Sequence, residues 1–256
     1  MIPLKDQNPT RRFPIVTLIL IGICAFVYLV PQQVHGIKVV DTGNTKVRVE
    51  ASRALSLRYA AIPCELTQRQ PLGVAEISQN RCTNEPLRRG PILFQAKNIY
   101  LAVLLSMFLH GSLLHLGGNV LYLWVFGNNI EDRFGSVFFL IFYLSGGVVA
   151  TIGHVLTDRS STIPVVGASG AIAAVMGAYL VWYPRASVIS YVPPIFVFPL
   201  KAQWFLAIWF VMQFFTNPNS GVAWVAHVAG FVFGAALAAL VGRPKTSGDG
   251  YNRSMT

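Results

Sequence analysis

Charged residues are scarce in this chain. Lysine, arginine, aspartate and glutamate make up 12% of its 256 residues, and the mean hydropathy is +0.53. A soluble domain carries about 25% charged residues, so this composition indicates a membrane protein. Between residues 98 and 242 the only acids are Glu131, Asp132 and Asp158. Paired charges within apolar runs and inverted repeats are both missing, which argues against a transporter or channel.

Cysteine is rare as well, with three residues in the chain. Cys24 lies in the first apolar run, where we expect it to pack as a small apolar side chain. Cys64 and Cys82 share the polar segment 38–97. The sequence leaves two alternatives for this pair, a disulfide or two free thiols.

Long uncharged runs are abundant. A membrane span needs about 20 apolar residues. Five runs reach that length: 13–37, 98–130, 134–157, 160–184 and 202–242. The last is long enough for two spans and breaks at the turn-forming residues 216–221. The sequence therefore predicts an all-α polytopic membrane protein with six transmembrane helices.

The net charge of +10 has two sources. Lysine and arginine flank alternate ends of the runs, which predicts that both termini are cytoplasmic. Half of the twenty basic residues lie in segment 38–97, which we expect to form a long first external loop. The charges lack interleaved aromatic residues, so we expect contact with membrane lipids and no nucleic-acid partner.

The chain divides into three parts on these grounds: a cytoplasmic segment 1–13, a membrane domain 14–242 and a cytoplasmic tail 243–256. Within the loop, alternating residues predict a strand over 46–50 and then an interfacial helix over 51–62. Four prolines predict irregular chain beyond it. The short N-terminus argues against an organelle transit peptide, and we expect a bacterial cytoplasmic membrane.

Ser169 opens an apolar helical stretch and is flanked by glycines, in Gly167-Ala168-Ser169-Gly170. Free backbone N–H groups at a helix N-terminus favour negative charge, so the amides of Ser169 and Gly170 could stabilise an oxyanion. A serine there could attack a carbonyl if a base took its proton. The alternative is a helix-packing motif, because Ser169, Ala173 and Gly177 form a stripe of small residues.

His227 lies in the last uncharged run, where an ionisable residue is rare and indicates a function. The small residues Gly230 and Gly234 share its face and would allow close contact with the helix of Ser169. That contact would give a serine–histidine dyad, since a buried triad aspartate would be costly in lipid. A histidine bonded to a neighbouring carbonyl is the alternative.

His115 and Asn119 are four residues apart and face the same way on a helix. Both side chains are suitable oxyanion donors. A zinc site made of His110, His115 and His227 is the competing idea, but the sequence holds no HExxH motif. We therefore expect no metal and no cofactor.

Three motifs appear in order along the chain: His115-x-x-x-Asn119, then Gly167-Ala168-Ser169-Gly170 with Gly177, then Ala226-His227-x-x-Gly230-x-x-x-Gly234. Together they resemble the signature motifs of the rhomboid intramembrane serine proteases. The segment 127–135 resembles the family's turn after its second helix, where Glu131 and Arg133 would have structural roles. The similarity covers roughly 98–242 and the first helix.

The resemblance implies a rhomboid-like bundle with Ser169 as nucleophile and His227 as general base. The oxyanion hole would be formed by His115, Asn119 and the Ser169 amide. The serine helix would start part-way into the membrane, below a water-filled cavity. Substrates would be single-span membrane proteins, cut in or near the span where small or helix-breaking residues let it unwind.

Two departures from the family pattern stand out. Some members carry a tyrosine four residues after the serine, packed on the histidine, and here that position is Ala173. The Trp-Arg pair found in many first loops is missing from 38–97. The leading hypothesis is a serine endopeptidase acting inside the membrane. The alternative is an inactive relative that binds membrane clients.

Overall fold

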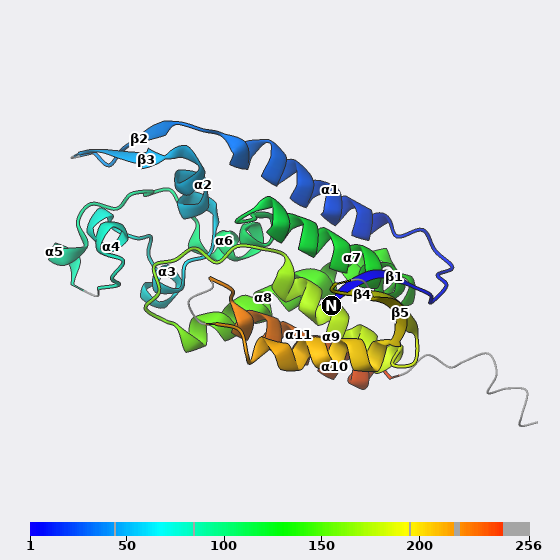
Figure 1. Cartoon of the computed structure of the whole chain (residues 1–256). Helices are drawn as coiled ribbons and strands as arrows, with labels where there is room; N and C mark the ends of the chain where they lie inside the picture. The colour runs from blue at the N-terminus through cyan, green and yellow to red at the C-terminus, as the bar shows by residue number, and fades with distance from the viewer. Residues whose placement is uncertain (44, 84, 195, 218–220, 243–256) are drawn as a thin grey trace, which may run out of the picture.

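The computed structural model describes residues 1–43, 45–83, 85–194, 196–217 and 221–242 (Figure 1). The predicted tail 243–256 and most of the predicted break at 216–221 lie outside these ranges. The chain is mostly helical. Its apolar helices are α1 (Ile15–Leu29), α6 (Ile99–Leu105), α7 (Leu113–Phe134), α8 (Ser136–Thr157), α9 (Ser169–Trp182), α10 (Ala202–Gln213) and α11 (Trp224–Val241).

Three of these segments are long and apolar enough to cross a membrane: Ile15–Gln33, Ser136–Thr157 and Trp224–Val241. A fourth candidate is the pair Ile99–Phe108 and Leu113–Phe134, which is bent by 81°. Two short 3₁₀ helices extend these segments: η1 (Pro31–Gln33) continues α1, and η2 (Ser106–Phe108) continues α6. The bend arises because the Ser112 side chain accepts from His115 N and caps a new helix.

Helix α9 is shorter than the run 160–184 predicts. It begins at Ser169 because Gly167 has φ +121°, a left-handed conformation that no helix continues through. Every residue from Gly170 to Tyr179 is buried. The neighbours of α9 are α7, α8, α10 and α11, so the helix is the centre of the bundle.

The prediction of a mostly helical fold is confirmed and that of six transmembrane helices stays a prediction, but all-α is too narrow, because the described residues also form two small sheets. The larger one is antiparallel with the order β1-β4-β5, from β1 (Ile2–Asp6), β4 (Ser187–Val192) and β5 (Phe196–Lys201). Residues 187–201 are rich in β-branched and aromatic side chains, which favour strands. The first residues of the chain are therefore part of the folded body.

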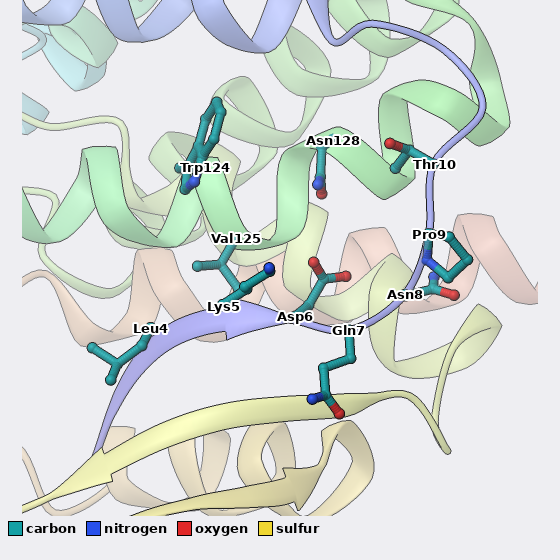
Figure 2. A pocket seen from close by; sticks show the side chains of 10 residues that line it. All are labelled: Leu4, Lys5, Asp6, Gln7, Asn8, Pro9, Thr10, Trp124, Val125 and Asn128. Atoms are coloured by element: carbon teal, nitrogen blue, oxygen red, sulfur yellow. The ribbon is translucent and has the colours of Figure 1, made fainter.

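Asp6 fixes β1 to the bundle. Its Oδ2 accepts from the Tyr179 hydroxyl at 2.9 Å and from Asn129 Nδ2 at 2.6 Å. Figure 2 shows the carboxylate pointing toward α7, at the wall of a cavity of about 560 Å³. Burial raises the pKa of Asp6. The strand is thus anchored on the helix that begins with Ser169.

Segment 37–97 is a folded unit at the end of the bundle away from the β1-β4-β5 sheet (Figure 1). It consists of the hairpin β2 (Ile37–Asp41) and β3 (Lys46–Glu50), then α2 (Ala51–Tyr59), α3 (Pro63–Gln68), α4 (Val74–Gln79) and α5 (Pro86–Arg89). The predicted strand is confirmed, and the predicted helix forms as far as Tyr59. The prediction of irregular chain after it is wrong, because Pro63 and Pro86 each begin a helix instead of ending one.

The core of this unit is apolar and cross-linked. Leu57, Ile62, Leu72 and Leu93 pack together around Cys64. Cys64 and Cys82 form a disulfide, which settles the alternatives that the sequence leaves open.

A buried ion pair closes the same unit. Lys97 Nζ lies 2.5 Å from Glu65 Oε2 and donates to the carbonyls of Leu57 and Ala60 at 2.7 and 2.8 Å. Burial lowers the pKa of Lys97 and raises the pKa of Glu65, while the opposite charge of each partner opposes these shifts. The ammonium group thus has two carbonyl acceptors and an opposite charge beside it, as a buried charge requires.

Glu131 joins three helix ends. Its carboxylate accepts from Val16 N at 2.9 Å, and from Thr17 N and Thr17 Oγ1 at 2.8 Å each, in the first turn of α1. It also accepts from Ser136 Oγ at 2.7 Å, at the start of α8. Two residues on, the guanidinium of Arg133 lies over the Trp182 ring, 5.5 Å from its centre.

Candidate active site

Ser169 is the first residue of α9, and the turn before it is tightly constrained. Gly167 N donates to Ser106 O at 3.0 Å, which holds the turn against η2. A Cβ at Gly167 would lie 2.7 Å from the His115 ring. Glycine is therefore required there both by its positive φ and by the approach of the imidazole.

The structure brings Ser169 and His227 into hydrogen-bond contact. His227 Nε2 lies 2.8 Å from Ser169 Oγ, although the two residues are 58 positions apart in the chain. The other ring nitrogen, Nδ1, lies 2.8 Å from Oε1 of Gln213, at the end of α10. A hydroxyl, an imidazole and an amide oxygen therefore stand in a row, which is an arrangement that can activate a serine.

Close contact between α9 and α11 sets this distance. A Cβ on Gly177 would overlap the Phe231 carbonyl oxygen, one on Gly230 would overlap the Gly170 oxygen, and one on Gly234 would overlap the Ala174 oxygen. The backbones of the two helices thus touch along a seam of glycines. The packing interpretation of the small-residue stripe is therefore confirmed, and the catalytic interpretation of Ser169 stays a prediction.

His115 and Asn119 line the other side of the serine turn. The Cβ position of Gly167 is 3.6 Å from Asn119 Nδ2. Among the residues that the structure describes, this buried Nδ2 has no hydrogen-bond acceptor. A buried donor without a partner calls for an explanation, and a ligand oxygen is the simplest one.

The zinc hypothesis finds no support in the geometry. The nitrogens of His110, His115 and His227 do not gather into a cluster of possible metal ligands within the described ranges. Both nitrogens of His227 already face partners at 2.8 Å, Ser169 and Gln213. This leaves His227 without a free lone pair for a metal.

A cavity of about 770 Å³ gives access to these groups. Ser169, His227, His115 and Asn119 all line it. Part of its wall is the extended segment 161–166, which the folded unit 37–97 holds in place. Val165 N donates to Ala61 O at 2.8 Å, and Cys64 N donates to Ser161 O at 2.9 Å.

Two site residues are missing from the sequence-based hypothesis, Gln213 and Trp209. Gln213 is 8% exposed, and the Trp209 ring lies 5.9 Å from the His227 ring. A signal for Gln213 exists in the sequence: it is the one amide between residues 204 and 216, in an otherwise apolar stretch. Polar side chains in such stretches mark functional sites.

Comparison with known proteins gives one family. The family model described as Rhomboid domain matches residues 97–244. The human "Presenilin-associated rhomboid-like protein, mitochondrial" is 37% identical over 100 residues, which are 38% of this chain and 26% of that protein. "Rhomboid protein 1, mitochondrial" of Saccharomyces cerevisiae is 27% identical over 144 residues, 55% of this chain and 35% of that one.

A bacterial relative also matches: "Rhomboid protease GluP" of Bacillus subtilis is 38% identical over 78 residues, 30% of this chain and 15% of that protein. The chain thus spans about a third or less of the length of these relatives. The human and yeast proteins are named as mitochondrial, which points away from a bacterial plasma membrane. The expectation of a bacterial cytoplasmic membrane with cytoplasmic termini is therefore corrected.

Proposed function

This chain belongs to the rhomboid family, and from that premise we propose that it is an intramembrane serine endopeptidase. It hydrolyses peptide bonds in or near the spans of single-span membrane proteins. The observation that carries the proposal is the 2.8 Å contact between Ser169 Oγ and His227 Nε2, on the wall of a cavity.

The reaction follows from the positions of these groups. Ser169 Oγ attacks the substrate carbonyl carbon while His227 Nε2 takes the hydroxyl proton. The negative charge on the carbonyl oxygen is met by the N–H groups of Ser169 and Gly170. These precede the first hydrogen bond of α9, which runs from Ile172 N to Ala168 O.

The side chains of His115 and Asn119 complete the oxyanion hole from the opposite wall. When the tetrahedral intermediate collapses, His227 gives its proton to the leaving amine and the acyl group stays on Ser169. A water molecule then loses a proton to His227 and attacks the ester. Its hydrolysis frees Ser169 and releases the second product as a carboxylic acid.

The proposed membrane placement rests on the family and on the uncharged runs. In it, residues 14–242 are a six-helix membrane domain that includes the short helices α9 and α10, with segment 38–97 outside the bilayer and lipids around the bundle. At 1.5 Å per residue, the 14 residues of α9 extend about 21 Å, whereas the hydrocarbon core is about 30 Å thick. Ser169 therefore lies part-way into the membrane, and the cavity supplies the water that hydrolysis needs.

A probe that needs no known substrate tests the proposal. We expect a fluorophosphonate to label the purified protein in detergent, and to label neither Ser169→Ala nor His227→Ala. Once a substrate is found, Asn119→Ala should cleave it roughly 10- to 1000-fold more slowly, the range for one oxyanion donor. Absence of labelling in a wild-type sample that unfolds cooperatively would refute the proposal and favour a client-binding protein without activity.

A further inference from the structure

We propose that Gln213 is the positioning residue of His227, and that it takes the place of an acid in this active site. The inference rests on the proposed function, because it assigns a role within the serine–histidine dyad. It starts from one contact, the 2.8 Å between Gln213 Oε1 and His227 Nδ1.

The direction of this hydrogen bond is fixed by the other end of the amide. Gln213 Nε2 donates to the Trp209 carbonyl at 2.9 Å, and a carbonyl oxygen can only accept. The amide therefore turns its oxygen to His227. Because that oxygen has no proton to give, Nδ1 must carry the ring proton, and Nε2 keeps a lone pair for the Ser169 hydroxyl.

The amide suits this place because it is neutral. When His227 takes the proton of Ser169, the carbonyl dipole of Gln213 stabilises the cation without a second charge in an apolar helix. Glu131 is the buried acid nearest in sequence to Ser169. Its carboxylate accepts hydrogen bonds from the first turn of α1 and is therefore engaged away from His227. No carboxylate of the described residues is hydrogen-bonded to His227.

Helix α10 holds the imidazole in place on this side. The Trp209 ring lies 5.9 Å from the His227 ring at an interplanar angle of 40°. On α9, Ala173 stands where some rhomboid proteases carry a tyrosine that packs on the histidine. Ala173 is buried and too small for that contact. The last turn of α10 therefore supplies both the ring contact and the hydrogen bond.

Other titratable groups lie near the dyad. His115 comes from α7 and His154 from α8, and the exposed Asp158 lies on the wall of the same cavity. A substitution at Gln213 leaves these three side chains in place, and none of them is hydrogen-bonded to Gln213, whose side chain contacts His227 directly. A change in the pH profile that appears only in Gln213 variants is therefore assignable to the Gln213–His227 contact.

The test compares three variants by their fluorophosphonate labelling rates from pH 5 to 9. Gln213→Leu keeps the volume and removes the acceptor, and Gln213→Glu restores an acceptor oxygen with a charge. Gln203→Leu, in the first turn of the same helix, is the matched control. We expect Gln213→Leu to label about 10- to 100-fold more slowly, the effect of losing one hydrogen bond to a charged group. The control should label at the wild-type rate.

Gln213→Glu should retain labelling, and the acid limb of its rate profile should move to higher pH because a carboxylate stabilises the protonated imidazole. A purely structural role for Gln213 predicts no such movement. Wild-type labelling of Gln213→Leu, or an unmoved acid limb in Gln213→Glu, would overturn the inference. If Gln213→Leu does not fold, the acid limb of Gln213→Glu decides alone. Failure of the wild type to label would instead overturn the proposed function.

Discussion

Replacing Glu131 with alanine should destabilise the bundle without touching the active site. Four donors lose their acceptor: Val16 N, Thr17 N, the Thr17 hydroxyl and the Ser136 hydroxyl. The hydroxyls can turn to other acceptors, but the two N–H groups in the first turn of α1 cannot. Thr17 is fully buried.

A buried donor left without a partner costs about 1–3 kcal/mol, which applies in full to Thr17 N, whereas Val16 N is part-buried and adds a smaller cost. The measurement is the unfolding midpoint in detergent micelles, followed by circular dichroism. Asp132→Asn is the matched control. Its carboxylate accepts only from Arg12 N at an exposed position, and we expect a change within about 0.5 kcal/mol.

A second observable separates local from global damage. If Glu131 caps α1, limited proteolysis should cut the α1 region of Glu131→Ala first, because its first turn loses its acceptor. Equal midpoints for Glu131→Ala and Asp132→Asn, with the same cleavage pattern, would refute the reasoning. In that case water would have to accept the hydrogen bonds of the Val16 and Thr17 N–H groups in the first turn of α1.

Two further predictions concern packing and pH. Gly234→Ala places a methyl group against the Ala174 carbonyl oxygen, so α11 must move away from α9. We expect a loss of about 1–3 kcal/mol and slower labelling of Ser169, whereas Gly22→Ala, with open space around it, should change neither. Unchanged labelling in Gly234→Ala would show that the seam does not set the dyad distance. Asp6 has a pKa raised by burial, so the folded state holds its proton more tightly than the unfolded state does. Its ionisation therefore costs stability as the pH rises above the ordinary value of 3.8, and the cost is lost below it. The unfolding free energy of Asp6→Asn should lack this fall between about pH 4 and neutrality, and parallel pH curves for the two proteins would contradict the assignment.

The site residues that could be predicted from the sequence are the polar residues that stand in otherwise apolar runs. A histidine in an uncharged run and a serine between glycines stand out because the membrane makes polar groups costly there. The predicted contact between Ser169 and His227 is present in the structure as a hydrogen bond. The candidate spans follow from hydropathy in the same way.

What could not be predicted depends on contacts distant in sequence. Gln213 is the one amide in its apolar stretch, and only the packing of α10 against α11 brings its oxygen to His227. Strand β1 looks like a polar tail because its partner β4 begins at Ser187. The start of α9 at Ser169 agrees with the sequence, but its cause, the positive φ of Gly167, is not visible in the hydropathy.

The anchoring of Asp6 has a consequence for biosynthesis. Ile2 pairs with Tyr191, and the Asp6 carboxylate meets a hydroxyl 173 residues later in the chain. At 5–20 residues per second, the ribosome needs roughly 10–40 s to reach β4 after making β1. During that interval the first strand has neither its neighbouring strand nor the Tyr179 hydroxyl. Strand β1 thus waits for partners made much later, and a chain stalled before residue 187 would carry an unpaired β1 and an unburied Asp6.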